Sequence, residues 1–96
     1  MKVVFTRHAE IMLEEIGDYI ARDNPTRALS FIRELRAKAL GLADMPLAFP
    51  LVPRHAHNGV RRRVHGNYLI LYVPREDHVV ILAIAHGARD YERLLE

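Results

Sequence analysis

Apolar residues recur every three or four positions across the first half of the chain, which predicts two amphipathic helices. The first is expected over about residues 7–22, and the second begins at Asn24-Pro25. Asn is a favoured N-cap and proline suits the first helical position, so this dipeptide separates the two helices. Because the turn is short, we expect the helices to lie antiparallel. The apolar positions are Ala9, Leu13, Ile16 and Ile20 in the first helix, and Ala28, Ile32, Leu35, Ala39 and Leu42 in the second.

The second half of the chain is expected to form strands, because its apolar residues are largely β-branched or aromatic and turn residues interrupt them. A basic strand over 60–65 leads through Gly66-Asn67 into an apolar strand over 68–73, and a polar turn leads into a third over 79–85. Prolines at 46, 50 and 53 predict an extended connection over 44–53. With a short strand over 2–5, the pattern predicts an α+β fold. An antiparallel helical hairpin would pack on an antiparallel sheet of about four strands.

Both faces of the two central strands are apolar, although the chain has one pair of helices to cover the sheet. We therefore expect one apolar face to be left uncovered and to bind a protein partner. The alternative is that the C-terminal segment, residues 91–96, folds back over this face. Alternation places Tyr68, Ile70 and Tyr72 opposite Leu69, Leu71 and Val73, and places Val79, Ile81, Ala83 and Ala85 opposite Val80, Leu82 and Ile84.

Length and composition favour one small globular domain over residues 1–96. Half of the residues are hydrophobic and 27% are charged, and no apolar run is long enough for a membrane span or a signal peptide. The chain has no cysteine, which excludes disulfides and thiolate chemistry and agrees with a reducing compartment. We expect a cytoplasmic protein that contacts no membrane.

Positive charge is concentrated in one segment, although the net charge is only +2. Residues 54–65 contain four arginines and three histidines and no acid. Arginine offers a planar fork for phosphate or carboxylate groups, so nucleic acid and an acidic protein are both possible partners. Alternatively, the charges protect an exposed sheet edge from unwanted pairing. The helices differ as well: acids dominate the outer surface of the first, and basic residues that of the second.

The sequence contains no pattern typical of a cofactor or metal site. His55, His57 and His65 lie in a cationic segment without any carboxylate, which disfavours a divalent ion. Phosphate-binding glycine loops, nucleophile motifs and dinucleotide fingerprints are absent from the sequence. We predict no metal and no cofactor.

A set of residues occurs in a fixed order along the whole chain. Its members are Ala9, Leu13 and Ile16, Tyr19-Ile20-Ala21, Ala28, Leu42, Pro46, the arginine-rich strand, Tyr68-Leu69-Ile70-Leu71-Tyr72, Val80-Ile81-Leu82 and His86-Gly87-Ala88-Arg89-Asp90. This ordered set resembles the RelE/ParE toxins over essentially the whole chain. The resemblance implies the toxin half of a type II toxin-antitoxin pair, with a ParD-like antitoxin that forms a hetero-oligomer with it and covers the free sheet face. The predicted antitoxin-binding residues are Arg61, Arg63, Leu69, Leu71, Val80 and Leu82.

Two activities divide the family that the chain resembles. RelE-type members cut messenger RNA on the ribosome with several basic side chains, whereas ParE-type members poison DNA gyrase. Leu69 stands where the ribonuclease pattern has a cation, and the tyrosine expected beyond the last arginine has no equivalent. The resemblance thus favours a non-enzymatic gyrase poison without sequence-specific DNA binding, with Arg89 and Tyr91 contacting the target. The alternatives are a ribonuclease that uses Arg61, Arg63, His86 and Arg89, and a binding module that has lost toxicity.

Overall fold

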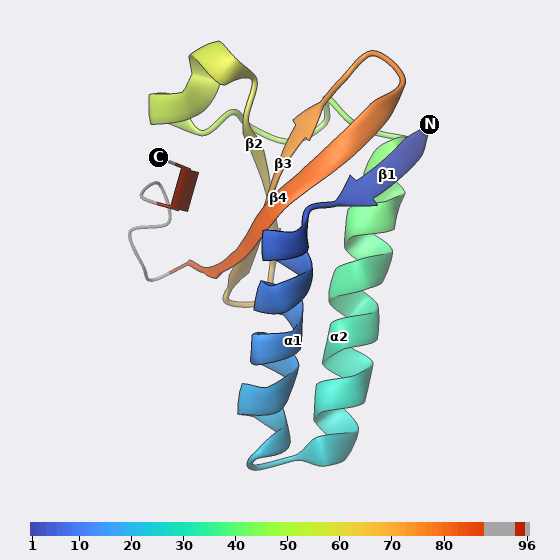
Figure 1. Ribbon diagram of the computed structural model, residues 1–96, viewed down its shortest axis with the longest axis vertical. Helices are drawn as coiled ribbons and strands as arrows, with labels where there is room; N and C mark the ends of the chain where they lie inside the picture. The colour runs from blue at the N-terminus through green and yellow to red at the C-terminus, as the bar shows by residue number, and fades with distance from the viewer. Residues whose placement is uncertain (88–93, 96) are drawn as a thin grey trace.

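A helical hairpin and a four-stranded sheet make up the fold (Figure 1). The computed structural model describes residues 1–87 and 94–95. The helices lie side by side, and their connecting turn extends beyond the sheet at the lower end of the view. The elements in chain order are β1 (Lys2–Phe5), α1 (Arg7–Ala21), α2 (Pro25–Leu40), the short 3-10 helices η1 (Gly41–Ala43) and η2 (Pro53–Asn58), β2 (Arg61–His65), β3 (Tyr68–Pro74) and β4 (His78–His86).

Both helices begin at the residues that the sequence predicts. The Thr6 hydroxyl accepts a hydrogen bond from the Ala9 N–H at 3.1 Å, and the Asn24 side chain accepts one from the Arg27 N–H at 3.0 Å. Each cap satisfies a backbone donor that has no partner inside its helix. The predicted hairpin and its turn are therefore confirmed.

The sheet is mixed, whereas the sequence pattern predicts a wholly antiparallel one. The strand order is β1-β4-β3-β2, with β1 parallel to β4 and the other two pairs antiparallel. A parallel pair needs a long connection, and the segment between Phe5 and His78 contains both helices and two strands. Side-chain periodicity indicates the faces of a strand but not its neighbours, so it could not show this pairing.

A β-bulge in β4 reverses the predicted alternation partway along the strand. Leu71 pairs with Ala83 and Tyr72 pairs with Ile81, so Leu82 is the extra residue. Ile81 and Ile84 consequently share the helix-covered core, and Ala83 lies on the other face. The predicted grouping of Ala83 with Ile81 is therefore wrong beyond the bulge. A single sequence shows no sign of the inserted residue, because every position around it is apolar.

Thr6 joins the start of α1 to this bulge. Its N–H donates to the Ile81 carbonyl at 3.0 Å, and its hydroxyl donates to the Leu82 carbonyl at 3.1 Å while it caps the helix. The bulge residue lies outside the regular pairing, and Thr6 supplies a partner for its carbonyl. One side chain thus fixes both the entry into α1 and the irregularity in β4.

Replacing Thr6 with Val is expected to destabilise the protein by about 2 kcal/mol, because it removes the helix cap and leaves the Leu82 carbonyl without its side-chain donor. Thermal or urea unfolding measures the loss. Thr6→Ser keeps the hydroxyl and should recover most of the stability. Unchanged stability of Thr6→Val would contradict the assignment, because valine keeps the methyl group of threonine and lacks only its hydroxyl.

The second sheet face is largely covered by the chain itself, which corrects the expectation of a free apolar face. Val52 and Val60, on either side of η2, pack with Leu69, Leu71, Val73 and Ala83 in one buried cluster. Leu95 packs against this cluster too. Of the C-terminal segment that the alternative names, only residues 94–95 are described. Leu71 is 0% exposed and Leu69 is 6% exposed. The sequence pattern missed the cover because the segment before β2 has no regular periodicity.

In the part of the chain that the structure describes, no helix is both long and apolar enough to cross a membrane.

Candidate functional site

Two arginines of β2 bind backbone carbonyls of the proline-rich connection (residues 44–52) and of α2. Arg61 donates through Nη1 to the Phe49 carbonyl at 2.6 Å and, more weakly, to that of Leu47 at 3.4 Å. Arg63 donates to the Lys38 carbonyl at 3.0 Å, and its guanidinium lies 4.7 Å from the centre of the Phe49 ring. Both guanidinium groups therefore have a role inside the chain. Their contact with an antitoxin stays a prediction, since each keeps further N–H donors.

Tyr72 contributes a third bond to the same connection. Its ring is fully buried, and its hydroxyl donates to the Pro46 carbonyl at 2.9 Å. Burial raises the pKa of the Tyr72 hydroxyl, and the nearby positive charge of Arg61 partly opposes that rise. A connection without regular pairing must find donors for its carbonyls elsewhere. Side chains of β2 and β3 supply these donors. The signal in the sequence is a strand rich in arginine that follows a segment rich in proline, whose carbonyls lack regular partners.

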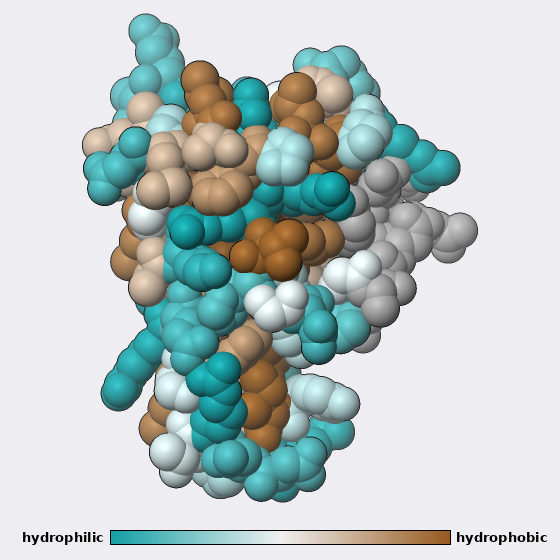
Figure 2. All heavy atoms as spheres, turned by 180° about the vertical axis from the view of Figure 1, so that it is seen from behind, coloured by the Kyte–Doolittle hydropathy of each residue, from teal (hydrophilic) through white to brown (hydrophobic). Residues whose placement is uncertain are grey.

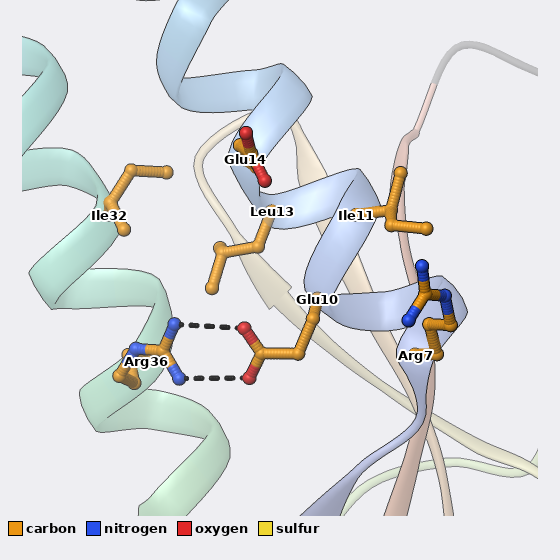
Figure 3. A pocket seen from close by; sticks show the side chains of 7 residues that line it. All are labelled: Arg7, Glu10, Ile11, Leu13, Glu14, Ile32 and Arg36. Atoms are coloured by element: carbon orange, nitrogen blue, oxygen red, sulfur yellow. Dashed lines mark hydrogen bonds and ion pairs between the residues drawn. The ribbon is translucent and has the colours of Figure 1, made fainter.

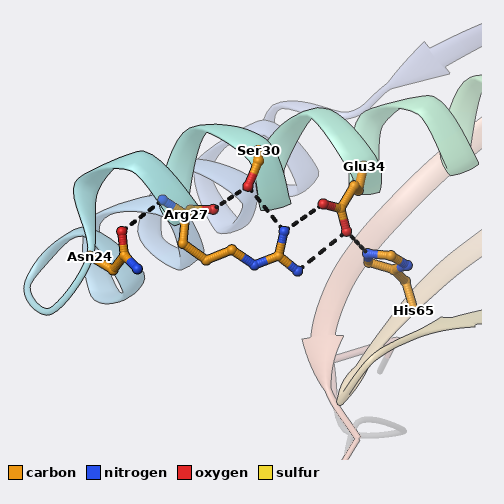
Figure 4. A network of polar contacts seen from close by, with 5 residues as sticks. All are labelled: Asn24, Arg27, Ser30, Glu34 and His65. Carbon is orange, nitrogen blue, oxygen red and sulfur yellow. Dashed lines mark hydrogen bonds and ion pairs between the residues drawn. The ribbon is translucent and has the colours of Figure 1, made fainter.

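The opposite end of β2 is tied to α2 by a polar network around Glu34 (Figure 4). Glu34 accepts hydrogen bonds from Arg27, which lies two turns earlier in the helix, and its Oε1 lies 3.0 Å from the His65 Nε2. The Arg27 hydrogen bond is the main cause of a lowered pKa at Glu34, with smaller contributions from its bond to His65 and from the two nearby charges. The network holds the end of the β2–β3 hairpin against the helix.

This network predicts a loss of stability in acid. The pKa of Glu34 lies below the ordinary glutamate value of 4.5 in the folded chain, so folding favours its ionised form. Its contribution is fully present above the unfolded-state pKa and is lost as the pH falls through the lowered folded-state value. Unfolding measured between pH 7 and 3 should show this decline. Glu34→Gln should lack that part of the pH dependence, and an unchanged profile in the variant would contradict the assignment.

His86 lies at the end of β4, beside the turn between β2 and β3. Its ring meets the Tyr68 ring edge-on, with 5.3 Å between the centroids, and Tyr68 in turn packs edge-on against Phe31. The Gly87 N–H donates to the Asn67 carbonyl at 2.7 Å. A shallow pocket of about 270 Å³ opens here. Its lining consists of Val64, Gly66, Asn67, Tyr68, Leu69, His86 and Gly87.

The structure does not bring the basic strand residues and His86 together. Arg61 is level with Tyr72 in the sheet and Arg63 with Ile70, whereas His86 is level with Tyr68 on the far side of β3. The two arginines are therefore four and two residues from the level of His86, or about 13 and 7 Å along a strand, and β3 lies between them and β4. Arg63 is directed toward the C-terminal end of α2 and the Phe49 ring. Two other predicted residues, Arg89 and Tyr91, lie outside the described residues.

Exposed apolar side chains remain around the covered sheet face. Figure 2 shows apolar atoms gathered over the connection between α2 and β2, above a strongly hydrophilic band, and a further apolar group below it. Val64 in the edge strand β2 is 56% exposed, and Leu47 is 68% exposed. Val80 and Leu82, both predicted to bind an antitoxin, are partly exposed. Of the four predicted apolar contacts, these two are the accessible ones.

Known proteins resemble the chain in sequence pattern and in fold. Residues 3–91 match the family model described as "ParE toxin of type II toxin-antitoxin system, parDE". No curated protein has a significantly similar sequence. A chain of "Chromosomal ParDE TA system from P. aeruginosa" superposes with a TM-score of 0.76 at 20% identity, over 90% of this chain and 95% of that one. A chain of the toxin-antitoxin complex RelBE2 from Mycobacterium tuberculosis gives a TM-score of 0.67 at 26% identity, over 92% of each chain. The predicted fold class and family resemblance are confirmed.

Proposed function

The chain belongs to the ParE toxin family of type II toxin-antitoxin systems, and we propose that it acts by binding DNA gyrase and inhibiting it, without bond chemistry of its own. The observation that carries the choice against RNA cleavage is the separation of the candidate ribonuclease residues. Arg61 binds the Phe49 carbonyl of the connection and Arg63 binds the Lys38 carbonyl of α2, whereas His86 lies at the far end of β4. Leu69, which stands where the ribonuclease pattern has a cation, is buried in the cluster on the second sheet face.

RNA cleavage needs a base for the 2′ proton, an acid for the leaving oxygen and cations for the phosphorane, all within contact distance of one phosphate. The described candidates do not converge in that way. A toxin that binds a protein target needs no such convergence, and the family match supports that mode of action.

The test compares both targets with one preparation. The purified chain is expected to inhibit supercoiling by gyrase and to accumulate cleaved DNA complexes, while messenger RNA in a translating extract stays intact. Cleavage of the messenger with gyrase unaffected would replace this proposal with the ribonuclease alternative. Arg61→Met and His86→Ala should leave the RNA result unchanged, since neither residue is assigned to catalysis.

We propose further that a ParD-like antitoxin binds along the accessible rim of the second sheet face, at Val64, Val80 and Leu82. The two solved structures compared above are described as a toxin-antitoxin system and a toxin-antitoxin complex, which supports a partner of this kind. Val64 lies in an edge strand, and Val80 and Leu82 lie beside the sealed cluster, so a partner can reach them without opening the core.

Coexpression with the cognate antitoxin tests this surface. The double change Val64→Asp and Leu82→Asp should weaken the complex at least tenfold, because it introduces two charges into an apolar contact. Tyr19→Asp is the matched control, since Tyr19 is 64% exposed and lies near the turn between the helices, away from the sheet. Equal affinities for all three proteins, each shown to be folded, would move the antitoxin to another surface.

A further inference from the structure

The outer face of the helical hairpin carries opposite charges on its two helices, and some of them form no ion pair with any other described residue. Glu14 and Asp18 of α1 and Arg33 of α2 are exposed. Among the residues that the structure describes, none of these three forms an ion pair, whereas the neighbouring Glu10 and Arg36 bind each other through two hydrogen bonds of 3.2 and 3.3 Å (Figure 3). The charge of the hairpin is thus only partly neutralised within the chain.

Exposed apolar residues share this face with the charges. Ile11, Glu14 and Asp18 follow one another at three- and four-residue spacing and form one stripe along α1. Leu29, Arg33 and Leu40 are spaced by four and seven residues and form the corresponding stripe along α2. Ile11, Leu29 and Leu40 are 45%, 63% and 50% exposed. A groove of about 460 Å³ lies between the helices, with Leu13 and Ile32 among its lining residues.

The two charged residues lie at the same level of the hairpin. A Cβ atom on Gly17 would be 3.3 Å from the Ile32 side chain, and Glu10 bonds to Arg36 closer to the sheet. Glu14 lies between Gly17 and Glu10 along α1, and Arg33 lies between Ile32 and Arg36 along α2. The two contacts therefore place Glu14 and Arg33 at matching heights, side by side on one face.

We propose that a second copy of this chain docks on this face, with a two-fold axis that runs along the hairpin. Such an axis sets α1 of one copy against α2 of the other. Each Glu14 then meets Arg33 of the second copy, twice in one symmetric interface. An axis across the hairpin would instead set α1 against α1 and α2 against α2, so that Glu14 would not face Arg33 of the second copy. The charges thus select one of the two arrangements.

The size of the face sets the strength of this association. Helices of about 15 residues are about 23 Å long, and two of them side by side cover about 20 Å, which gives a total buried area of about 900 Å². That area is below the range of stable interfaces and is typical of transient ones. The dimer should therefore form at high concentration and dissociate on dilution.

Sedimentation equilibrium of the full chain, from micromolar to millimolar concentration, tests the proposal. Glu14→Arg and Arg33→Glu are each expected to weaken self-association at least tenfold, because each creates two like-charge contacts. Mixing the two variants should restore dimers, since the Glu14→Arg chain presents two cations at these contacts and the Arg33→Glu chain presents two anions. Glu15→Arg, the same change one residue along on a different side of α1, should associate like the original chain.

Restored association in the mixture cannot arise from a general change in charge or folding, so it identifies the Glu14–Arg33 contact between copies. The proposal is overturned if the original chain stays monomeric at millimolar concentration, or if the mixture remains as monomeric as its components. The inference does not depend on the proposed target, because neither outcome involves gyrase or RNA.

Discussion

Replacing Leu71 with Ala is expected to destabilise the protein by about 3 kcal/mol and to lower its melting temperature by about 15 °C. Leu71 is 0% exposed in the cluster formed by Val52, Val60 and the second face of the sheet. The substitution removes buried methyl groups and leaves a cavity, since the strands on both sides of Leu71 prevent collapse. A small domain has little stability to spare, so Leu71→Asp should prevent folding altogether.

Val64→Ala is the control for this change. Val64 pairs with Leu69 in the sheet but is 56% exposed, so truncating it should alter stability by no more than about 0.5 kcal/mol. Thermal and denaturant unfolding of both variants measure the difference. A small effect at Leu71 would mean that the segment before β2 does not seal this face in solution, and would return Leu71 to the accessible antitoxin contacts.

Arg63→Met should cost about 2 kcal/mol, although the residue lies in a basic edge strand where sequence reasoning expects contacts to a partner. The change keeps the aliphatic stem and removes the hydrogen bond to the Lys38 carbonyl and the contact of the guanidinium with Phe49. The Lys38 carbonyl lies in the last turn of α2, where a cation also interacts favourably with the helix dipole.

The matched control is Arg33→Met, which removes an arginine that forms no ion pair among the described residues and should leave stability nearly unchanged below the concentration at which the chain associates. Hydrogen exchange supplies the second measurement: amides of the connection over residues 44–52 should exchange faster in Arg63→Met. If Arg63→Met has the same free energy of unfolding as the original chain, the hydrogen bond to α2 does not contribute to stability. Arg63 would then be available to contact a partner.

The helical hairpin, the strand positions and the family resemblance could all be predicted from the sequence, for local physical reasons. Asn24-Pro25 caps the second helix by its own chemistry, and the apolar stripes of both helices follow from the helical period. The strands of the second half are recognisable from β-branched residues between turn residues. These features depend on residues that are close together in the sequence, so a single sequence is enough to predict them.

The candidate site could be predicted less well, because its contacts join residues that are distant in the sequence. The sequence pattern identified Val80 and Leu82 as apolar strand residues, but it could not tell them from Leu69 and Leu71, which Val52 and Val60 seal. It also treated Arg61 and Arg63 as contacts to a partner, whereas their guanidinium groups bind the carbonyls of Phe49 in the connection and of Lys38 in α2.

By itself, the sequence determined which segments are helix and strand, which residues are apolar, and that positive charge gathers in one strand. The tertiary structure alone decided that β1 joins β4 in parallel, that Leu82 bulges and reverses the faces of β4, and that the chain covers its own second sheet face. Propensity and periodicity act over a few residues, while strand order, register and burial depend on which distant segments meet. The contacts of a charged or apolar side chain with residues distant in the sequence are therefore known only from the tertiary structure.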